Sequence, residues 1–246
     1  MTLLVSAVSG CASGSDDPET AAPQIQVGDC FAEGSVRPVD CSENHVAQTV
    51  YVSDSPPTNP AEALAPCREA QAKFLGQDFN TRLDINLWVP EDKSWYRCDV
   101  FVRNSTQARA GYQVLTGSLK GVLSEGVSVK LQACLDEVYD ATTDQTYVPC
   151  DQPHRSQELF VAPAIGTRDE AFPGDVSRRA TQACNATASA AGEIIGGRSV
   201  SAYYPENSSA WSTGERSADC WLTADRGQLP VVKPDKQQQH SASGDS

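Results

Sequence analysis

The sequence predicts an α+β protein built from two small homologous domains in tandem, each with one main helix packed on an antiparallel sheet and two disulfides. Two observations lead to this prediction. Eight of the nine cysteines fall into two sets of four, and the residues around them recur in the same order. Each set also surrounds one helix-like segment flanked by short strand-like segments. The chain has 246 residues, which suits two domains of about 100 residues each.

The internal repeat is clearest around the second cysteine of each set. A constant offset of 109 residues aligns a cysteine, a histidine and a glutamine: Cys41 with Cys150, His45 with His154 and Gln48 with Gln157. Farther along the chain the offset grows, so the second copy carries insertions. The next matches are Cys67 with Cys184, Trp95 with Trp211 and Cys98 with Cys220. We therefore predict two homologous domains, at residues 27–117 and 127–229.

The first half begins with a strand at residues 27–31, and residues 35–41 can return as its hairpin partner. Residues 45–52 are rich in Val and Thr, which favours another strand. Residues 83–89 and 95–102 alternate between polar and apolar side chains, as a closing hairpin does.

One helix is expected between these strands. Asn59 is a good N-cap, and Pro60 suits the first turn. Pro66 leaves two alternatives, because an interior proline kinks or breaks a helix. Either one kinked helix runs from Pro60, or a short turn precedes a helix that starts near Pro66. Both versions end at about Leu75, where Gly76 is a natural stop.

The second half repeats this pattern. Strands are predicted at residues 129–138, 146–150 and 155–162, and the final hairpin pairs residues 200–204 with 217–223. The helix is predicted at residues 175–194, which contain no proline.

The N-terminus is typical of an exported protein. Residues 1–11 look like the end of an apolar export signal, and Val8-Ser9-Gly10-Cys11 resembles the bacterial lipobox, whose cysteine carries the lipid. No basic residue precedes the apolar run, so we expect that the true start lies upstream and that the signal is truncated here. The alternative is an ordinary apolar segment with a free thiol at Cys11. Small, polar and acidic residues make 12–26 a flexible tether and 230–246 a disordered tail.

Lipidation of Cys11 would leave eight cysteines, an even number that predicts disulfides in an exported protein. No Cys-x-x-Cys pair occurs, which disfavours zinc-ribbon and thioredoxin folds. Four cysteines allow three pairings in each domain. We favour first with second, which braces a hairpin, and third with fourth, which joins helix to sheet. The expected bonds are Cys30–Cys41, Cys67–Cys98, Cys134–Cys150 and Cys184–Cys220.

Three motifs resemble those of the septum-formation domain family, found in actinobacterial exported and membrane-anchored proteins. Gly28-Asp29-Cys30-Phe31 resembles the opening motif, and Cys150-Asp151-Gln152-Pro153-His154 resembles the Cys-x-x-Pro-His motif. The segment from Trp211 to Arg216, followed by Cys220, resembles the closing motif. The resemblance implies two tandem copies of the family domain and a link to the cell envelope or the division septum.

His45 and His154 are the residues most suggestive of chemistry. Each follows a cysteine in a Cys-x-x-x-His arrangement, which could ligate zinc. We favour a structural role, in which the ring donates a hydrogen bond to the backbone beside a disulfide. No Gly-x-Ser-x-Gly motif is present. We therefore predict no catalytic residue, metal or cofactor, and keep an exported hydrolase or metal-binding protein using His45 or His154 as the alternative.

Two tryptophans and an arginine are candidates for binding. Trp95 and Trp211 could be platforms for a sugar or a peptide, or could pack in the core beside the last cysteine of each domain. Arg216 could pair with a nearby acidic residue or recognise an anion, and we favour the local pair.

Charge and hydropathy exclude several classes. Acidic residues outnumber basic ones 32 to 19, for a net charge of −13, which argues against nucleic-acid binding. No apolar run reaches the roughly 18 residues that span a bilayer. The sequence thus predicts a non-catalytic binding or scaffold module, lipid-anchored on the extracytoplasmic face of the cell membrane. Its expected partners are that membrane and an envelope protein or cell-wall ligand.

Overall fold

The computed structural model describes residues 24–57, 59–167, 169–193, 197–212 and 214–231. The first half contains β1 (Cys30–Phe31), β2 (Ala47–Ser53), α1 (Pro60–Leu75), β3 (Leu83–Trp88) and β4 (Tyr96–Val102). The second half contains β5 (Cys134–Leu135), β6 (Ser156–Glu158), α2 (Val176–Ala190), β7 (Arg198–Tyr203), α3 (Ser208–Ser212) and β8 (Asp219–Ala224). The predicted signal at residues 1–11 with Cys11, most of the tether at 12–26 and most of the tail at 230–246 lie outside the described residues.

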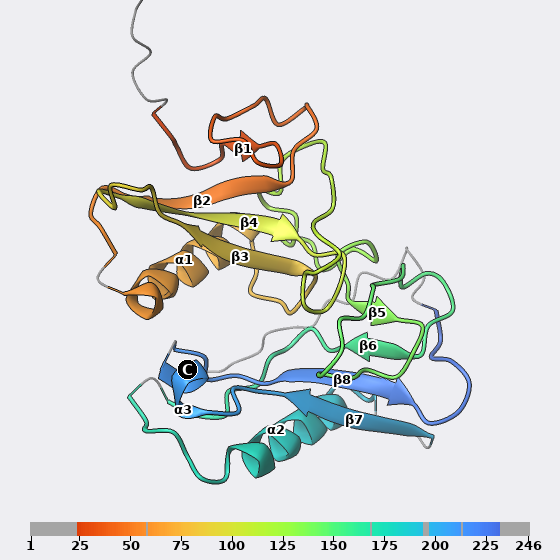
Figure 1. The fold of residues 1–246 in the computed structure, drawn as a ribbon. Coiled ribbons are helices and arrows are strands. Elements are labelled where there is room, and N and C mark those ends of the chain that lie inside the picture. Colours follow the sequence, from red (N-terminus) through yellow and green to blue (C-terminus); the bar gives the residue numbers. More distant parts are fainter. Residues whose placement is uncertain (1–23, 58, 168, 194–196, 213, 232–246) are drawn as a thin grey trace, which may run out of the picture.

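The two halves contain antiparallel sheets with the same strand order (Figure 1). The first sheet runs β1-β2-β4-β3, and the second runs β5-β6-β8-β7. In each sheet the last strand of the half lies in the interior and pairs with two neighbours. The α+β class predicted from the sequence is confirmed, with four disulfides.

Helix α1 is a single helix that continues through Pro66, so the first of the two alternatives is correct. Asn59 caps its start by accepting a hydrogen bond from the backbone N–H of Glu62 at 2.9 Å. Gly76 ends it in the left-handed conformation, with φ of 100°, which glycine adopts without strain. The disulfide between Cys67 and Cys98 joins the helix to β4 directly after the proline.

Several predicted elements are shorter than expected. The return strand at 35–41 is reduced to one bridge between Val39 and Cys30. The strand at 146–150 is reduced to two isolated bridges, one between Val148 and Cys134 and one between Thr146 and Ser105. Of the strand predicted at 129–138, only β5 forms. These segments are turn-rich and closed by disulfides, so they do not need a full ladder of hydrogen bonds to keep their shape.

Helix α2 ends earlier than predicted, because Gly192 has a φ of 70° and the N–H of Glu193 turns back to the carbonyl of Ala188 at 2.9 Å. The predicted end at Ile194 lies outside the described residues. The short helix α3 was not predicted at all.

Each helix covers one face of its own sheet with a separate apolar core. Helix α2 buries a stripe of small residues at every fourth position: Val176, Ala180, Cys184 and Ala188. In the first half, Leu119, Leu123 and Leu131 from the segment between the sheets join the core of α1. The connection between the halves is therefore packed against the first half.

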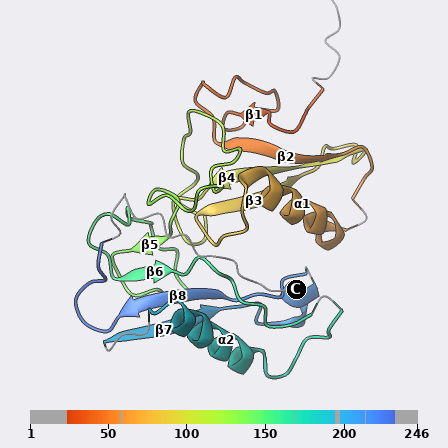
Figure 2. The same ribbon diagram turned by 180° about the vertical axis from the view of Figure 1, so that it is seen from behind.

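The halves stack so that α1 lies on the side of the first sheet that faces the second half, whereas α2 lies on the far side of the second sheet (Figures 1 and 2). Backbone hydrogen bonds cross between them, including Asn80 N–H to Phe160 O at 2.7 Å and Tyr147 N–H to Asn104 O at 3.0 Å. Within the described part of the chain, no helix has the length and apolarity needed to cross a membrane.

Candidate binding site

The structure contains four disulfides, and they are the pairs favoured from the cysteine order: Cys30–Cys41, Cys67–Cys98, Cys134–Cys150 and Cys184–Cys220. The first and third bonds close the turns that lead into each sheet. The second and fourth join each main helix to the interior strand of its sheet. These eight cysteines are therefore used in disulfide bonds and are not free to ligate a metal.

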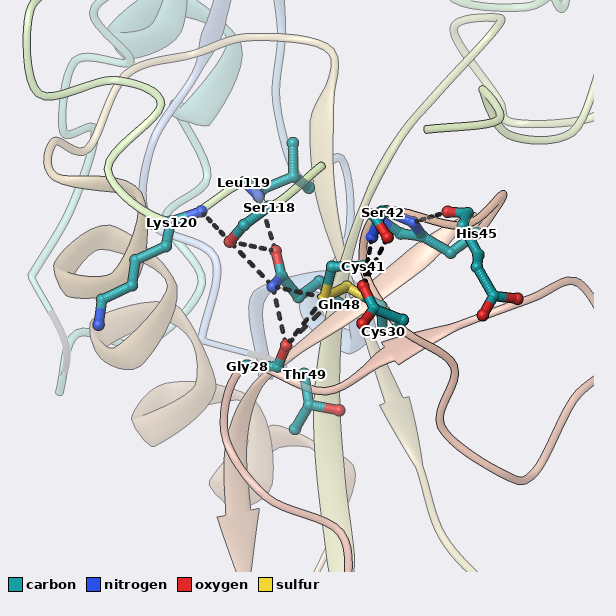
Figure 3. The surroundings of a disulfide bond; sticks show 12 residues. Gly28, Cys30, Cys41, Ser42, His45, Gln48, Thr49, Ser118, Leu119 and Lys120 are labelled. Atoms are coloured by element: carbon teal, nitrogen blue, oxygen red, sulfur yellow. Dashed lines mark hydrogen bonds between the residues drawn. A yellow bond between two sulfur atoms is a disulfide. The ribbon is translucent and has the colours of Figure 1, made fainter. Parts of the chain in front are cut away.

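His45 and His154 are buried beside these turns, and Figure 3 shows His45 near the bond between Cys30 and Cys41. Nδ1 of His45 lies 2.9 Å from the carbonyl of Glu43, and Nδ1 of His154 lies 2.8 Å from the carbonyl of Gln152. A carbonyl only accepts, so Nδ1 carries the proton in both rings. In the part of the chain that the structure describes, no three His, Cys, Asp or Glu residues gather in a group able to hold a metal.

A buried glutamine ties the first disulfide turn to the segment between the halves. The amide of Gln48 donates to the carbonyl of Gly28 at 2.9 Å and accepts from the backbone N–H of Leu119 at 2.7 Å. Figure 3 shows this amide beside the bond between Cys30 and Cys41. The contacts of this region are local and structural in character, and one buried atom, Nε2 of His45, has no hydrogen-bond partner among the described residues.

Trp211 and Arg216 hold a loop of the second half together. Trp211 is buried, and its indole N–H donates to the carbonyl of Glu170 at 2.7 Å. The guanidinium of Arg216 lies 4.1 Å from the centre of the Trp211 ring and donates to the carbonyl of Thr167 at 3.0 Å. Trp211 is therefore a core residue.

Trp95 is half-buried and packs on Trp88 with ring centres 5.1 Å apart. None of the residues singled out from the sequence lines the two cavities between the halves that are described next.

Two cavities of about 290 Å³ and 560 Å³ lie between the halves, and together they form what we call the cleft. The same four residues border both: Arg103, Glu158, Tyr203 and Asp219. Arg103 follows β4 of the first half, and the other three come from strands of the second sheet. The site is therefore assembled only when the two halves are docked.

Strand pairing places the acidic and aromatic residues of the second sheet on one face. Glu158 of β6 pairs with Trp221 of β8, and Tyr203 of β7 pairs with Asp219 of β8. Because Asp219 and Trp221 are two residues apart in a strand, all four side chains share one face of the sheet. This face is opposite the one covered by α2, and we call it the open face.

Aromatic rings form much of the wall of the smaller cavity. Tyr139 stacks on Trp221 with ring centres 4.4 Å apart and planes 4° apart. The guanidinium of Arg82 lies 5.3 Å from the centre of the Tyr147 ring. Burial raises the pKa of Tyr139 and the pKa of Tyr147, so both phenols stay neutral at physiological pH.

Glu158 is the most unusual residue of the cleft. Its side chain is buried, with 5% of the residue exposed, and Oε2 has no hydrogen-bond partner among the described residues. Burial, and then the negative charge of Asp219, raise the pKa of Glu158 well above its usual range, while Arg103 acts in the opposite direction. A buried carboxylate oxygen without a donor is a costly arrangement that proteins seldom keep without a use.

The neighbouring groups only partly compensate this charge. Asp219 accepts a hydrogen bond from the Asn80 amide at 3.2 Å, and burial raises the pKa of Asp219. Arg103 lies with Nε 3.6 Å from Asp84 and donates to the carbonyl of Thr106 at 3.0 Å. The arginine of the cleft is thus engaged by other groups of the first half.

Sequence reasoning did not single out Glu158 or Asp219. A signal was available, because Glu158 lies within the predicted strand at 155–162 and is followed by Leu159 and Phe160. A carboxylate next to such an apolar run is a candidate for burial. What could not be anticipated is that Asp219 and the first half would meet it there.

Comparison with known proteins decides the family. A family model described as septum formation matches residues 56–220. The chain belongs to the septum-formation family. No curated protein and no solved structure matches it. The septum-formation match is continuous from before α1 to Cys220, so it spans both halves and includes Glu158 and Asp219.

Proposed function

We propose that this septum-formation protein is a non-catalytic binding module of the cell envelope, held at the extracytoplasmic face of the membrane by a lipid on Cys11. Its ligand site is the cleft between the halves. The observation that carries this proposal is the buried carboxyl group of Glu158, a residue that borders both cavities and whose Oε2 has no hydrogen-bond partner among the described residues. The family supports a role connected with septum formation.

The location follows from two features. Four disulfides suit an oxidising compartment outside the cytoplasm. The lipobox-like residues 8–11 supply the anchor, and residues 12–26 supply a polar tether that would hold the folded part off the membrane.

The two halves are proposed to be homologous domains, at residues 27–117 and 127–229, that arose by duplication. Their equal strand order and the equal placement of their disulfides support this origin. Because the family match runs through both halves, the duplication would lie within one family unit.

The competing function is an exported hydrolase. His45 and His154 are poor candidates for it, because their rings are bonded to backbone carbonyls beside disulfides. Glu158 and Asp219 are better ones, since glycosidases also use two carboxyl groups in a cleft. The unpartnered oxygen favours binding, because a general acid must also reach a bond to be broken, whereas a bound donor satisfies the oxygen at once.

The test is the position of the full-length precursor, with its true signal, in dividing cells. Wild-type protein should be membrane-bound and enriched at septa, and Cys11→Ala should be released from membranes or accumulate as precursor. The double variant Glu158→Gln/Asp219→Asn should stay on the membrane but lose septal enrichment. Glu125→Gln, an exposed carboxylate outside the cleft, is the matched control and should behave like wild type. Septal enrichment that survives the double variant contradicts the proposal.

A further inference from the structure

We propose that the cleft binds a primary ammonium group at the end of an alkyl chain, of the kind that a lysine side chain carries, with Glu158 and Asp219 as its acceptors. This inference rests on the proposed function, since it names the ligand class of the same site. It depends on three observations, which are the hydrogen bonds, the charges and the walls of the cleft.

The two central carboxyl groups of the cleft lack donors, whereas the buried Nε of Arg103, also without a hydrogen-bond partner among the described residues, lies 3.6 Å from the carboxylate of Asp84. Oε2 of Glu158 is buried without a partner among the described residues, and Asp219 receives one bond at 3.2 Å from Asn80. An ammonium group supplies three donors and no acceptor, so it complements this pair. An anionic or carbonyl-rich ligand would place further acceptors against Oε2. The carboxyl pair therefore favours a ligand that donates hydrogen bonds.

The charged residues that border the cleft also favour a cation. The larger cavity is bordered by five carboxylates, at Asp78, Asp84, Glu158, Glu215 and Asp219, and by two arginines, at Arg68 and Arg103. Arg68 pairs with Glu215 at 3.3 Å, and Arg103 lies 3.6 Å from Asp84. Among the described residues, three carboxylates of this cavity have no such ion pair: Asp78, Glu158 and Asp219. Glu158 and Asp219 are the two that border both cavities, and a cation placed between the halves would neutralise them.

The walls suit an alkyl chain that ends in a compact cation. Tyr139, Tyr203 and Trp221 border the smaller cavity, and aromatic rings attract ammonium groups while packing against methylene groups. Its volume of about 290 Å³ is at the lower end of the roughly 300–1,000 Å³ of ligand pockets. A single unpartnered oxygen matches the point charge of an ammonium better than the two-pronged fork of a guanidinium, which prefers both oxygens of a carboxylate.

Binding should depend on pH through the carboxyl groups. The groups around Glu158 are Asp219 on the neighbouring strand, Arg103 and Asp84 from the first half, and the tyrosines at 139, 147 and 203. Because burial raises the pKa of Glu158, acid leaves it protonated and unable to attract a cation. A lysine-type amine has a pKa of about 10.4, so it stays charged while Glu158 ionises. Affinity should therefore increase from about pH 5 to about pH 8.

The experiment is calorimetric titration of the oxidised mature protein with Nα-acetyl-lysine amide. Nα-acetyl-norleucine amide, which keeps the four-carbon chain and lacks the ammonium group, is the neutral control, and Nα-acetyl-arginine amide tests the guanidinium. The lysine probe should bind about tenfold or more tightly than norleucine, as a charge-assisted hydrogen bond predicts, and more tightly than arginine. Glu158→Gln and Asp219→Asn should each remove most of this preference, and Glu125→Gln should retain it.

Several outcomes would overturn the inference. If the lysine and norleucine probes bind equally well, or if neither binds, the cleft does not recognise an ammonium group. This comparison uses the wild-type protein alone. Binding or cleavage of an N-acetylglucosamine oligosaccharide in place of the lysine probe points to the hydrolase. If the double variant loses septal enrichment in cells but the lysine probe does not bind, the proposed function stands and the ligand class is wrong. If the probe binds but septal enrichment is unaffected, the ligand class stands and the septal function of the cleft is wrong.

Discussion

The open faces of the two sheets have the same strand positions but opposite electrostatic character. Cys98 and Cys220 occupy equivalent places in β4 and β8, because each bonds to the main helix of its half. Counting from them, three pairs of positions correspond: Arg97 with Asp219, Asp99 with Trp221, and Thr49 with Glu158. The first face thus carries both signs of charge at these places, and the second carries two acids.

The first face pairs its two charges with each other, although Nη1 of Arg97 is buried without a hydrogen-bond partner among the described residues. Arg97 donates to Asp99 at 2.8 Å, and the hydroxyl of Thr49 donates to the other oxygen of Asp99 at 2.7 Å. The rings of Phe31 and Trp88 cover the guanidinium, with centres 3.7 Å and 4.7 Å from it. At Arg97 and Asp99 this is the side of the first sheet opposite α1, and the partners of both charges come from the first half.

The second face lies opposite the first half and takes its partners from there. Asn80 reaches Asp219, and Arg103 lies among the acidic groups. The same strand arrangement can therefore support two different electrostatic environments. On the first sheet, the ion pair and the aromatic rings of the same face cover the charges. On the second sheet, the face between the halves keeps a carboxyl oxygen without a hydrogen-bond partner among the described residues. Four predictions test this contrast.

The largest effect is expected from Arg97→Met. The substitution leaves Asp99, which is 6% exposed, buried without its ion-pair partner, and such losses cost about 3–5 kcal/mol. Urea unfolding of the oxidised protein measures it. The double variant Arg97→Met/Asp99→Leu should recover most of the loss, because an apolar pair replaces the buried charges. A loss under about 1 kcal/mol for the single variant would mean that the pair is not desolvated and that the two faces differ less than we infer.

The two histidines compare the halves at equivalent places. His45→Ala and His154→Ala should each cost roughly 1–3 kcal/mol, through a lost hydrogen bond and a lost buried ring. The effects should nearly add in the double variant, because the residues share no partner. His154 should be at the upper end, since its Nε2 also lies 3.3 Å from the side chain of Gln157. Thermal melts and zinc analysis check this, and unchanged melts with loss of bound zinc would contradict the structural role.

Glu158→Gln should have the opposite sign, and its effect should depend on pH. Below the unfolded pKa of about 4.3, the carboxyl is protonated in both states and costs nothing. As the pH rises, the unfolded chain ionises first because the folded pKa is raised, so wild-type stability falls until the folded pKa is passed. Glutamine does not ionise, so the Glu158→Gln variant does not lose stability in this way.

We therefore expect equal stability of wild type and Glu158→Gln near pH 4, and a variant that is about 1–2 kcal/mol more stable near pH 8. Urea unfolding at both pH values measures it, with Glu125→Gln as the control. A variant that is less stable than wild type at pH 8 would show that Glu158 is ionised and satisfied, as on the first face.

The smallest effect is expected from Arg68→Ala, which removes an ion pair between the halves. Its partner Glu215 lies 3.3 Å away, but the side chains are 41% and 45% exposed, and such pairs contribute about 0–1 kcal/mol. Unfolding at low and high salt measures the loss, which salt should reduce further. The halves should still unfold together, because backbone bonds from Asn80 and Tyr147 join them. Two separate unfolding transitions would instead show that this ion pair holds the two halves together.

Local features of the fold could be predicted where a residue type has one physical role. Asn59 and Gly76 marked the ends of α1, because a cap needs a side-chain acceptor and a left-handed turn needs glycine. The repeat around Cys41 and Cys150 marked equivalent turns. Gly192 carries the same information for α2, although the proline-free run around it predicts a longer helix.

The sequence by itself determined the α+β class, the order of the cysteines and the septum-formation family, because these depend on local propensity and on residues close in the chain. Only the tertiary structure decided that Trp211 is a core residue and that Glu158, Asp219 and Arg103 share a cleft. Those three residues come from strands or loops that are far apart in sequence. Their meeting depends on the register of β6 with β8 and on how the halves dock, which no local pattern encodes.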